Sequence, residues 1–182
     1  MSLISYVELL HLVESGVIDA DPANINGTSI DITLGNQIMV ERRGPIVGNV
    51  VDLKEKQQLQ MGPVRIPENG WLLLPGEFIL ATTQETFNLP DYISAEYKLK
   101  SSLARSGLQH LLAGWCDPGW TNSKLTLELI NVTRHHTLRI KTGMKIGQMV
   151  FWKCNPVPQD KSYSVTGQYN NQTTVTANKG VK

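Results

Sequence analysis

Short segments with β-branched or alternating apolar residues recur along most of this chain, and turn-forming residues separate them. Alternation with a period of two is typical of a strand that buries one face, and Gly or Pro between such segments indicates turns. The expected strands are residues 29–34, 37–40, 71–74, 78–83, 95–99, 125–132, 137–140 and 146–152. The turn signals are Gly35-Asn36, Pro75-Gly76, Pro118-Gly119 and Thr142-Gly143. The pattern predicts a mainly β barrel or jelly-roll, and the lack of long helices between the strands disfavours a doubly wound nucleotide-binding fold.

Three segments depart from this strand pattern. Residues 3–15 have a helical spacing of apolar residues and are followed by Gly16, which predicts one short amphipathic helix. Residues 50–69 are polar and contain Pro63 and Pro67, which suits a long surface excursion between strands. Residues 159–182 are rich in Gln, Asn, Thr and Lys, have almost no large apolar side chains and cannot form a core alone. We therefore expect one domain, with a barrel over residues 1–158 and a flexible C-terminal segment over residues 159–182.

Charge and cysteine content exclude several classes of protein. The 17 Lys and Arg residues nearly balance the 16 Asp and Glu residues, so no field of one sign predicts binding to long nucleic acid or to an anionic membrane. No apolar run approaches the ~20 residues of a membrane span, and the N-terminus lacks a signal-peptide pattern. Cys116 and Cys154 are isolated thiols, so no structural disulfide is expected. The chain is expected to be cytoplasmic.

Common catalytic motifs are missing from the sequence. Zinc-dependent nucleobase deaminases carry H-x-E followed by P-C-x-x-C, and neither element occurs here. The four histidines stand in no ligand spacing with the two cysteines, so we expect no zinc site and no metal bound directly by the protein. The sequence also has no G-x-x-x-x-G-K-[ST] phosphate loop and no G-x-S-x-G elbow.

One cluster does suit a phosphate chain, the sequence K-S-S-L-A-R-S-G at residues 100–107. Arg offers a planar fork of donors, Ser a short-range hydroxyl and Lys a mobile point charge. The alternative is an ordinary surface helical turn, with Ser101 as its N-cap and Leu103 packed inward. The residues of the cluster alone favour neither interpretation.

Neighbouring motifs carry a family resemblance that covers nearly the whole chain. In order they are N-G-T-S-I-D-I-T-L-G, L-P-G-E-F-I-L-A-T-T, N-L-P-D-Y, K-S-S-L-A-R-S-G-L, A-G-W-C-D-P-G-W, L-T-L-E-L-I-N and G-M-K-I-G-Q-M-V-F. Together they closely resemble dCTP deaminase of the dUTPase-like superfamily. The resemblance implies a distorted β-barrel of the dUTPase-like type, a homotrimer with active sites at subunit interfaces, dCTP as substrate, and Mg²⁺ bound through the nucleotide triphosphate, with no zinc.

The resemblance also implies roles for individual residues. Glu128, in T-L-E-L, matches the glutamate that activates the attacking water; the alternative is a solvent-facing residue of an alternating strand. Ser101 and Arg105 match residues that hold the water and polarise the base. Lys100, Ser101 and Ser102 fall where a neighbouring subunit grips the triphosphate, and Ala104 belongs to the same nucleotide-binding stretch. Lys100 stands where the family usually has Arg, so the bidentate fork is lost.

Sugar and base contacts are implied in the next two motifs. Asp117 matches the aspartate that hydrogen-bonds the deoxyribose 3′-hydroxyl, although before Pro118-Gly119 it could also be a plain turn residue. The backbone around Thr126 and Leu127 matches the edge that reads cytosine.

The C-terminal segment resembles the family's lid over the phosphates. Tyr163, Tyr169 and Gln172 stand at lid positions, and Gln168 occupies a nucleotide-binding position where the family has a basic residue. The family's Gly-Pro after the glutamine is replaced by Thr174-Val175, and Lys179 is left as the terminal cation. A polar tail of this kind can become ordered when it closes on triphosphate and magnesium.

The resemblance leaves several functions open. The main expectation is zinc-independent deamination of dCTP to dUTP and ammonia. The alternative is a bifunctional enzyme that also cleaves the triphosphate to dUMP and pyrophosphate, which the A-G-W-x-D string favours. A pure dUTPase or a catalytically silent nucleotide-binding regulator on the same scaffold is a weaker hypothesis.

Overall fold

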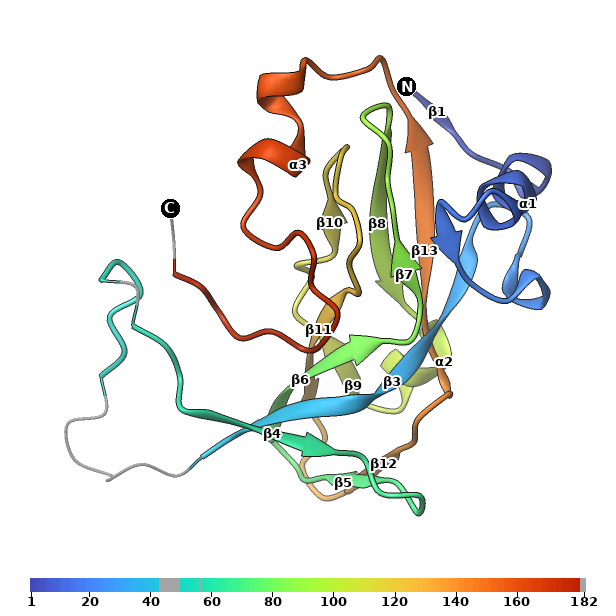
Figure 1. Cartoon of the computed structure of the whole chain (residues 1–182). Helices are drawn as coiled ribbons and strands as arrows, with labels where there is room; N and C mark the ends of the chain where they lie inside the picture. Colours follow the sequence, from blue (N-terminus) through green and yellow to red (C-terminus); the bar gives the residue numbers. More distant parts are fainter. Residues whose placement is uncertain (43–49, 56, 181–182) are drawn as a thin grey trace.

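The computed structural model describes residues 1–42, 50–55 and 57–180 (Figure 1). The strands are β1 (Ser2–Leu3), β2 (Ile18–Asp19), β3 (Ile30–Glu41), β4 (Met61–Arg65), β5 (Trp71–Leu73), β6 (Phe78–Thr83), β7 (Thr86–Phe87), β8 (Ile93–Leu99), β9 (Leu108–His110), β10 (Trp115–Cys116), β11 (Thr126–Asn131), β12 (Leu138–Ile140) and β13 (Lys145–Lys153). The helices are α1 (Tyr6–Glu14), α2 (Ser101–Arg105) and α3 (Tyr163–Thr166), with 3-10 turns η1 (Pro22–Asn24) and η2 (Gln159–Lys161). The predicted mainly β fold is confirmed.

The largest sheet curls into an incomplete barrel. Its antiparallel strands follow the order β10-β8-β13-β3-β6-β11-β9, and β1 and β4 add to β13 and β3. In Figure 1, β8 and β13 stand upright in one layer, while β6 and β4 cross below them in another. Strands β9 and β10 lie at opposite ends of this order, yet only residues 111–114 join them along the chain. The sheet must therefore curl enough to bring its two ends together.

Strand β3 links the two layers by changing partner along its length. Its first half pairs with β13, its second half pairs with β6 and β4, and the register shifts between Leu34 and Ile38. Gly35 lies at this shift, where a Cβ atom would be 2.8 Å from the Thr82 carbonyl oxygen. The prediction of two strands separated by a Gly35-Asn36 turn was wrong, because this glycine permits a close backbone approach inside one continuous strand.

Strand β4 lies inside the segment predicted as a surface excursion. It pairs with β3 from Gln37 opposite Arg65 to Glu41 opposite Met61. That part of the prediction for residues 50–69 was wrong. Pro63 is tolerated because, in the chain as described, β4 pairs with β3 alone, and an edge strand can accommodate a residue without an N–H group.

Helix α1 is shorter than the sequence pattern predicted. Residues 2 and 3 pair with β13 as strand β1, so the helix begins at Tyr6. Leu9 and Leu12 are buried against the barrel, whereas Val7 is exposed. Gly16 adopts a positive φ of 74° just after the helix, which confirms the predicted stop signal.

The core is continuous beneath the curled sheet. Phe87 stacks on Trp120 with ring centroids 5.4 Å apart, and Phe151 is fully buried. Cys116 is buried and Cys154 is half-buried, and both are free thiols. Along β11, Leu127 and Leu129 face the core, so the alternation predicted for this strand is confirmed.

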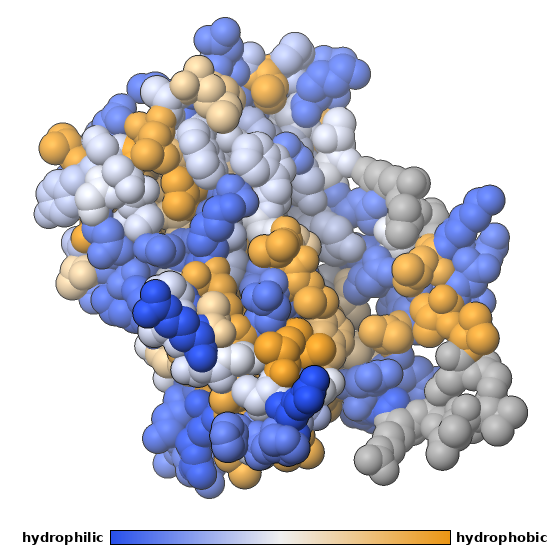
Figure 2. All heavy atoms as spheres, turned by 180° about the vertical axis from the view of Figure 1, so that it is seen from behind, coloured by the Kyte–Doolittle hydropathy of each residue, from blue (hydrophilic) through white to orange (hydrophobic). Residues whose placement is uncertain are grey.

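The surface is mostly polar, with apolar side chains reaching it in patches on the face seen in Figure 2. Exposed large apolar residues include Leu111 and Leu112, which directly follow β9. Leu112 is 86% exposed and has a positive φ of 62°, an uncommon conformation for a residue with a branched side chain. None of the helices in the described ranges has the length and apolar character needed to cross a membrane.

Candidate active site

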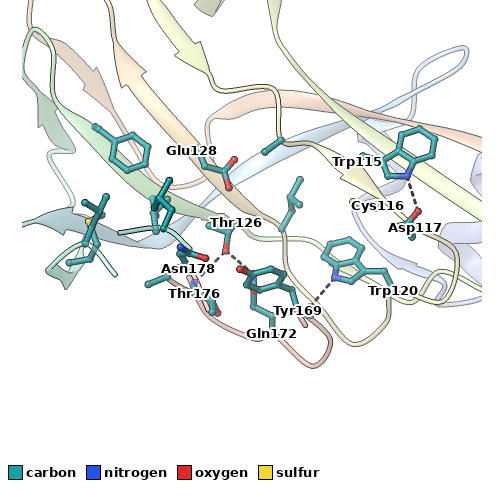
Figure 3. A pocket seen from close by; sticks show the side chains of 18 of the residues that line it. Trp115, Cys116, Asp117, Trp120, Thr126, Glu128, Tyr169, Gln172, Thr176 and Asn178 are labelled. Atoms are coloured by element: carbon teal, nitrogen blue, oxygen red, sulfur yellow. Dashed lines mark hydrogen bonds between the residues drawn. The ribbon is translucent and has the colours of Figure 1, made fainter. Parts of the chain in front are cut away.

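A pocket of about 510 Å³ lies against the face of β6 and β11, beneath the C-terminal segment (Figure 3). Pockets of a few hundred cubic ångströms are typical for small-molecule ligands. Several predicted site residues line this pocket: Asp117, Thr126, Glu128, Tyr163, Tyr169 and Gln172. The structure therefore brings together the catalytic candidate, the sugar candidate and the C-terminal candidates.

Strand β11 directs Glu128 and Thr126 into the pocket. Both lie on the face opposite the buried Leu127 and Leu129, because successive residues of a strand point to opposite faces. Leu127 is fully buried and pairs with Ala81 of β6, so the predicted base-reading edge is left to the backbone of Thr126. The pairing of β9 with β11 ends at Leu129, followed by one hydrogen bond from Leu111 N to Glu128 O. Beyond that bond, the start of β11 has no strand partner on this side within the described residues.

Glu128 has one oxygen toward the inside of the protein. Its side chain is 25% exposed, and its Oε2 lies 3.2 Å from Nε2 of the buried His110. Both atoms are buried and, among the described residues, make no aligned hydrogen bond despite this distance. The His110 ring lies against Tyr97, with centroids 4.7 Å apart. Glu128 is thus a carboxylate between a pocket and a buried imidazole, which suits a group that takes up and releases protons.

Asp117 follows β10 and is held by a neighbouring indole. Trp115 Nε1 donates a hydrogen bond of 2.9 Å to Asp117 Oδ1. Trp115 itself packs on Trp152 of β13, with ring centroids 5.9 Å apart. Cys116 lies between Trp115 and Asp117 in the sequence. Burial, and to a lesser extent the charge of Asp117, raises the pKa of its thiol. Cys116 is therefore a core thiol and unsuited to act as a nucleophile.

The predicted phosphate cluster does not line this pocket within one chain. Ser101, Ser102, Ala104 and Arg105 are exposed on α2, and none of them contributes to the pocket wall. The N-cap position belongs to Lys100 and Ser101 is the first helical residue, so the alternative role of Ser101 as N-cap was wrong. The helix packs instead beside β9.

The C-terminal segment runs back across the barrel and covers the pocket. Trp120 Nε1 donates to Tyr169 O at 3.0 Å, and Gln172 Nε2 donates to Thr126 Oγ1 at 2.7 Å (Figure 3). Gln172 is buried. Tyr163 also lines the pocket, and its own burial raises the pKa of its hydroxyl. The segment thus adopts a closed arrangement on its own barrel, while its flexibility and its closure on a triphosphate stay predictions.

Gln168 lies outside the pocket wall. Its carbonyl oxygen accepts a hydrogen bond of 2.8 Å from Lys179 Nζ, and the same ammonium group lies 5.2 Å from the Tyr169 ring centroid. Lys179 therefore brings a positive charge next to Tyr169, close to Gln168, which stands where the family has a basic residue.

Comparison with known proteins identifies the family. A family model described as dCTP deaminase-like matches residues 3–154, which is most of the chain. The chain belongs to the dCTP deaminase-like family.

Relatives within this family cover almost the same length. A protein of Nanoarchaeum equitans named "dCTP deaminase, dUMP-forming" is 36% identical over 177 residues, covering 87% of each chain. A protein of Persephonella marina with the same name is 34% identical, covering 94% of this chain and 93% of its own. The crystal structure of 2′-deoxycytidine 5′-triphosphate deaminase from Agrobacterium tumefaciens superposes with a TM-score of 0.63 at 19% identity, over 82% of this chain. This chain spans about half of that protein, covering 47% of its length, and the likeness supports the fold.

Two side chains of this candidate site were not identified from the sequence. His110 lies on the same buried face of β9 as Leu108, so by sequence it is indistinguishable from a core residue. Trp115 stands two residues before Asp117, and residues i and i+2 of a strand share a face. That spacing was a usable signal for Trp115.

Lys100 is engaged within its own chain. Its Nζ lies 2.7 Å from Asp31 Oδ1, and Lys145 Nζ lies 3.0 Å from Asp31 Oδ2. Burial raises the pKa of Asp31, but hydrogen bonds from Lys100, Lys145 and Asn26 outweigh it and hold the pKa below its ordinary value. Lys100 is therefore oriented by a buried carboxylate and does not extend freely.

No three His, Cys, Asp or Glu side chains within residues 1–42, 50–55 and 57–180 are grouped closely enough to hold a metal ion. His135 and His136 are exposed in the turn before β12.

Proposed function

We propose that this protein deaminates dCTP and goes on to form dUMP. The observation that carries the proposal is a pocket into which two separate carboxylates open, Glu128 from β11 and Asp117 after β10. The names of the relatives in Nanoarchaeum equitans and Persephonella marina favour this bifunctional reaction over the simpler deaminase that releases dUTP.

Deamination needs one group that can both accept and donate protons. A water molecule adds to C4 of cytosine, and Glu128 takes the proton that this water loses. Glu128 gives this proton to N3, and the proton of the new C4 hydroxyl then passes to the exocyclic amine, so that ammonia leaves and C4 keeps the oxygen as a carbonyl. A half-buried carboxylate beside His110 suits this exchange, because its two oxygens face different surroundings.

Formation of dUMP needs a second water molecule, which attacks the α-phosphorus and displaces pyrophosphate. Asp117 is the second carboxylate of the pocket and the candidate to bind the deoxyribose 3′-hydroxyl or to accept the proton of this water. The backbone N–H and C=O of Thr126 lie on the edge of β11 that β9 leaves unpaired, and they offer a donor and an acceptor for the cytosine ring.

The triphosphate is expected to be held by α2 of a neighbouring copy in a homotrimer. This proposal is supported by the absence of Ser101 and Arg105 from the pocket wall in one chain, and by the exposed Leu111 and Leu112, which directly follow β9. Mg²⁺ bound through the triphosphate would neutralise phosphate charge, and no acidic cluster of the protein is required for that role.

A complementation experiment tests the shared site. Chains with Glu128→Gln and chains with Arg105→Ala should each be inactive alone. After the two are unfolded and refolded together, activity should return, because mixed trimers contain sites with an intact Glu128 from one chain and an intact Arg105 from another. Failure of every mixture to regain activity would contradict the shared site.

Product analysis tests the reaction itself. Incubation with dCTP and Mg²⁺ should release ammonia, dUMP and pyrophosphate, with a zinc-selective chelator present. Release of ammonia with dUTP as the final product would replace our proposal by the simpler deaminase. Nucleotide binding without ammonia would point to a regulator.

Glu128→Gln gives the residue-level test. This change keeps the shape of the side chain but removes its basicity, so turnover should fall by about 10²-fold or more while dCTP binding persists. Glu96→Gln, on β8 outside the pocket wall, is the matched control and should retain activity. Retained turnover in Glu128→Gln would remove Glu128 from its role.

A further inference from the structure

Asp117 does not stand alone at the pocket wall. One of its oxygens, Oδ1, accepts the indole N–H of Trp115, and both residues line the pocket (Figure 3). The other oxygen, Oδ2, has no hydrogen bond within the part of the chain that the structure describes. An exposed carboxylate can rotate unless a donor holds one of its oxygens. The bond from Trp115 therefore fixes the orientation of the Asp117 carboxylate and the direction of its second oxygen.

Trp115 is itself held in place. The ring packs on Trp152 at 5.9 Å, although Trp115 is 53% exposed. An indole with only two side-chain torsions, fixed by a second aromatic ring, loses little conformational entropy when it donates a hydrogen bond. The pair is therefore a preorganised donor on the rim of the pocket.

We propose that Trp115 is a positioning residue which orients Asp117 so that its free oxygen accepts the 3′-hydroxyl of the deoxyribose. This proposal rests on one part of the proposed function, the binding of a deoxynucleotide with its 3′-hydroxyl at Asp117. It assigns to Trp115 a share in substrate selection: nucleotides with a free 3′-hydroxyl are preferred over those that lack it. Trp115 acts through Asp117 and does not touch the reacting atoms.

Trp115→Phe separates orientation from packing. Phenylalanine keeps an aromatic ring against Trp152 and removes only the N–H donor. Trp115→His is the rescue variant, because the Nε2 atom of histidine sits two bonds from Cγ, as Nε1 does in tryptophan. Both variants are best made with Glu128→Gln, so that bound nucleotide is not turned over.

The measurement compares the affinities of dCTP and 2′,3′-dideoxy-CTP by calorimetry. The protein that keeps Trp115 should bind dCTP more tightly than 2′,3′-dideoxy-CTP. Trp115→Phe should weaken the binding of dCTP roughly 2- to 12-fold, the range for loss of one hydrogen bond, and leave the affinity for the dideoxynucleotide unchanged. Trp115→His should restore most of the preference.

Other results would overturn the inference. Equal weakening of both nucleotides would mean that Trp115 supports the pocket in general. Unchanged dCTP affinity in Trp115→Phe, or no preference for the 3′-hydroxyl before the change, would also contradict it. Ammonia release is measured separately, so a chain that binds selectively without deaminating dCTP would refute the proposed function and leave this inference intact.

Discussion

Replacing Gly147 by alanine is expected to destabilise the protein through Tyr97. A Cβ atom at position 147 would meet Cε2, Cζ and the hydroxyl oxygen of Tyr97 at distances that real Cβ contacts do not reach. Tyr97 is buried against His110 and cannot swing into solvent. The added methyl group must therefore displace the Tyr97 ring or the backbone of β13.

The magnitude follows from the cost of overpacking a core, about 1–3 kcal/mol. In a protein of this size each kcal/mol lowers Tm by about 2–4 °C, so Gly147→Ala should lower Tm by roughly 2–12 °C. Because the Tyr97 ring packs on His110, and His110 lies 3.2 Å from Glu128, kcat should fall as well.

Adding Tyr97→Phe should restore part of the stability that Gly147→Ala loses. The Tyr97 hydroxyl is buried without a hydrogen bond among the described residues, so its removal alone should be neutral or slightly stabilising. In the double variant the hydroxyl is one of the three clashing atoms and is now absent, so the two changes should couple favourably by about 0.5–1.5 kcal/mol.

Thermal and urea unfolding at one fixed protein concentration provide the assay, since assembly would make Tm depend on concentration. Gly27→Ala is the matched control, because no atom lies within 4 Å of its added Cβ, and its stability should change by less than about 1 kcal/mol. If Gly147→Ala unfolded like Gly27→Ala, the close packing of Tyr97 on β13 would be refuted.

Two buried carboxylates, Asp31 and Glu85, should contribute to folding stability with opposite dependences on pH. The folded-state pKa of Asp31 is lowered below 3.8, because the hydrogen bonds from Lys100, Lys145 and Asn26 outweigh burial; its stabilisation is present above that value and is lost as pH falls through the folded pKa. Asp31→Asn should therefore cost about 1–2 kcal/mol near neutral pH, after allowance for solvent screening, and nothing in strong acid. Burial raises the pKa of Glu85 above 4.5 despite hydrogen bonds from Thr33, so its favourable contribution is present below 4.5 and is lost as pH rises through the folded pKa. Glu85→Gln should gain stability relative to the unaltered protein as pH rises; urea midpoints between about pH 3 and pH 8 that moved in parallel for both variants would contradict both signs.

Local patterns predicted the strands well where one face is buried. The alternation around Glu128 and the stop at Gly16 depend on neighbouring residues alone, and both were predictable. Gly35 was not, because a glycine in a turn and a glycine at a close strand crossing look the same in sequence. Strand β4 was hidden by Pro63, which an edge strand tolerates and a central strand does not.

The candidate site was predictable only in part for a related reason. Family motifs led to Glu128, Asp117 and the C-terminal residues that line the pocket. His110 reaches Glu128 from another strand, and contacts of that kind depend on register, which sequence spacing does not reveal. Arg105 lies away from the pocket of its own chain, and no pattern within one chain describes a second copy.

The two carboxylates of the pocket come from opposite ends of one strand order. Asp117 follows β10 at one end and Glu128 lies on β11 near the other, so the path between them along the sheet runs through the bend of β3 at Gly35. Their separation is set by the curvature of the whole sheet and, across the short route, by residues 111–114. Long insertions in peripheral loops should thus leave the chemistry intact, whereas a single inserted residue in β3 would alter the spacing of two groups that it never touches.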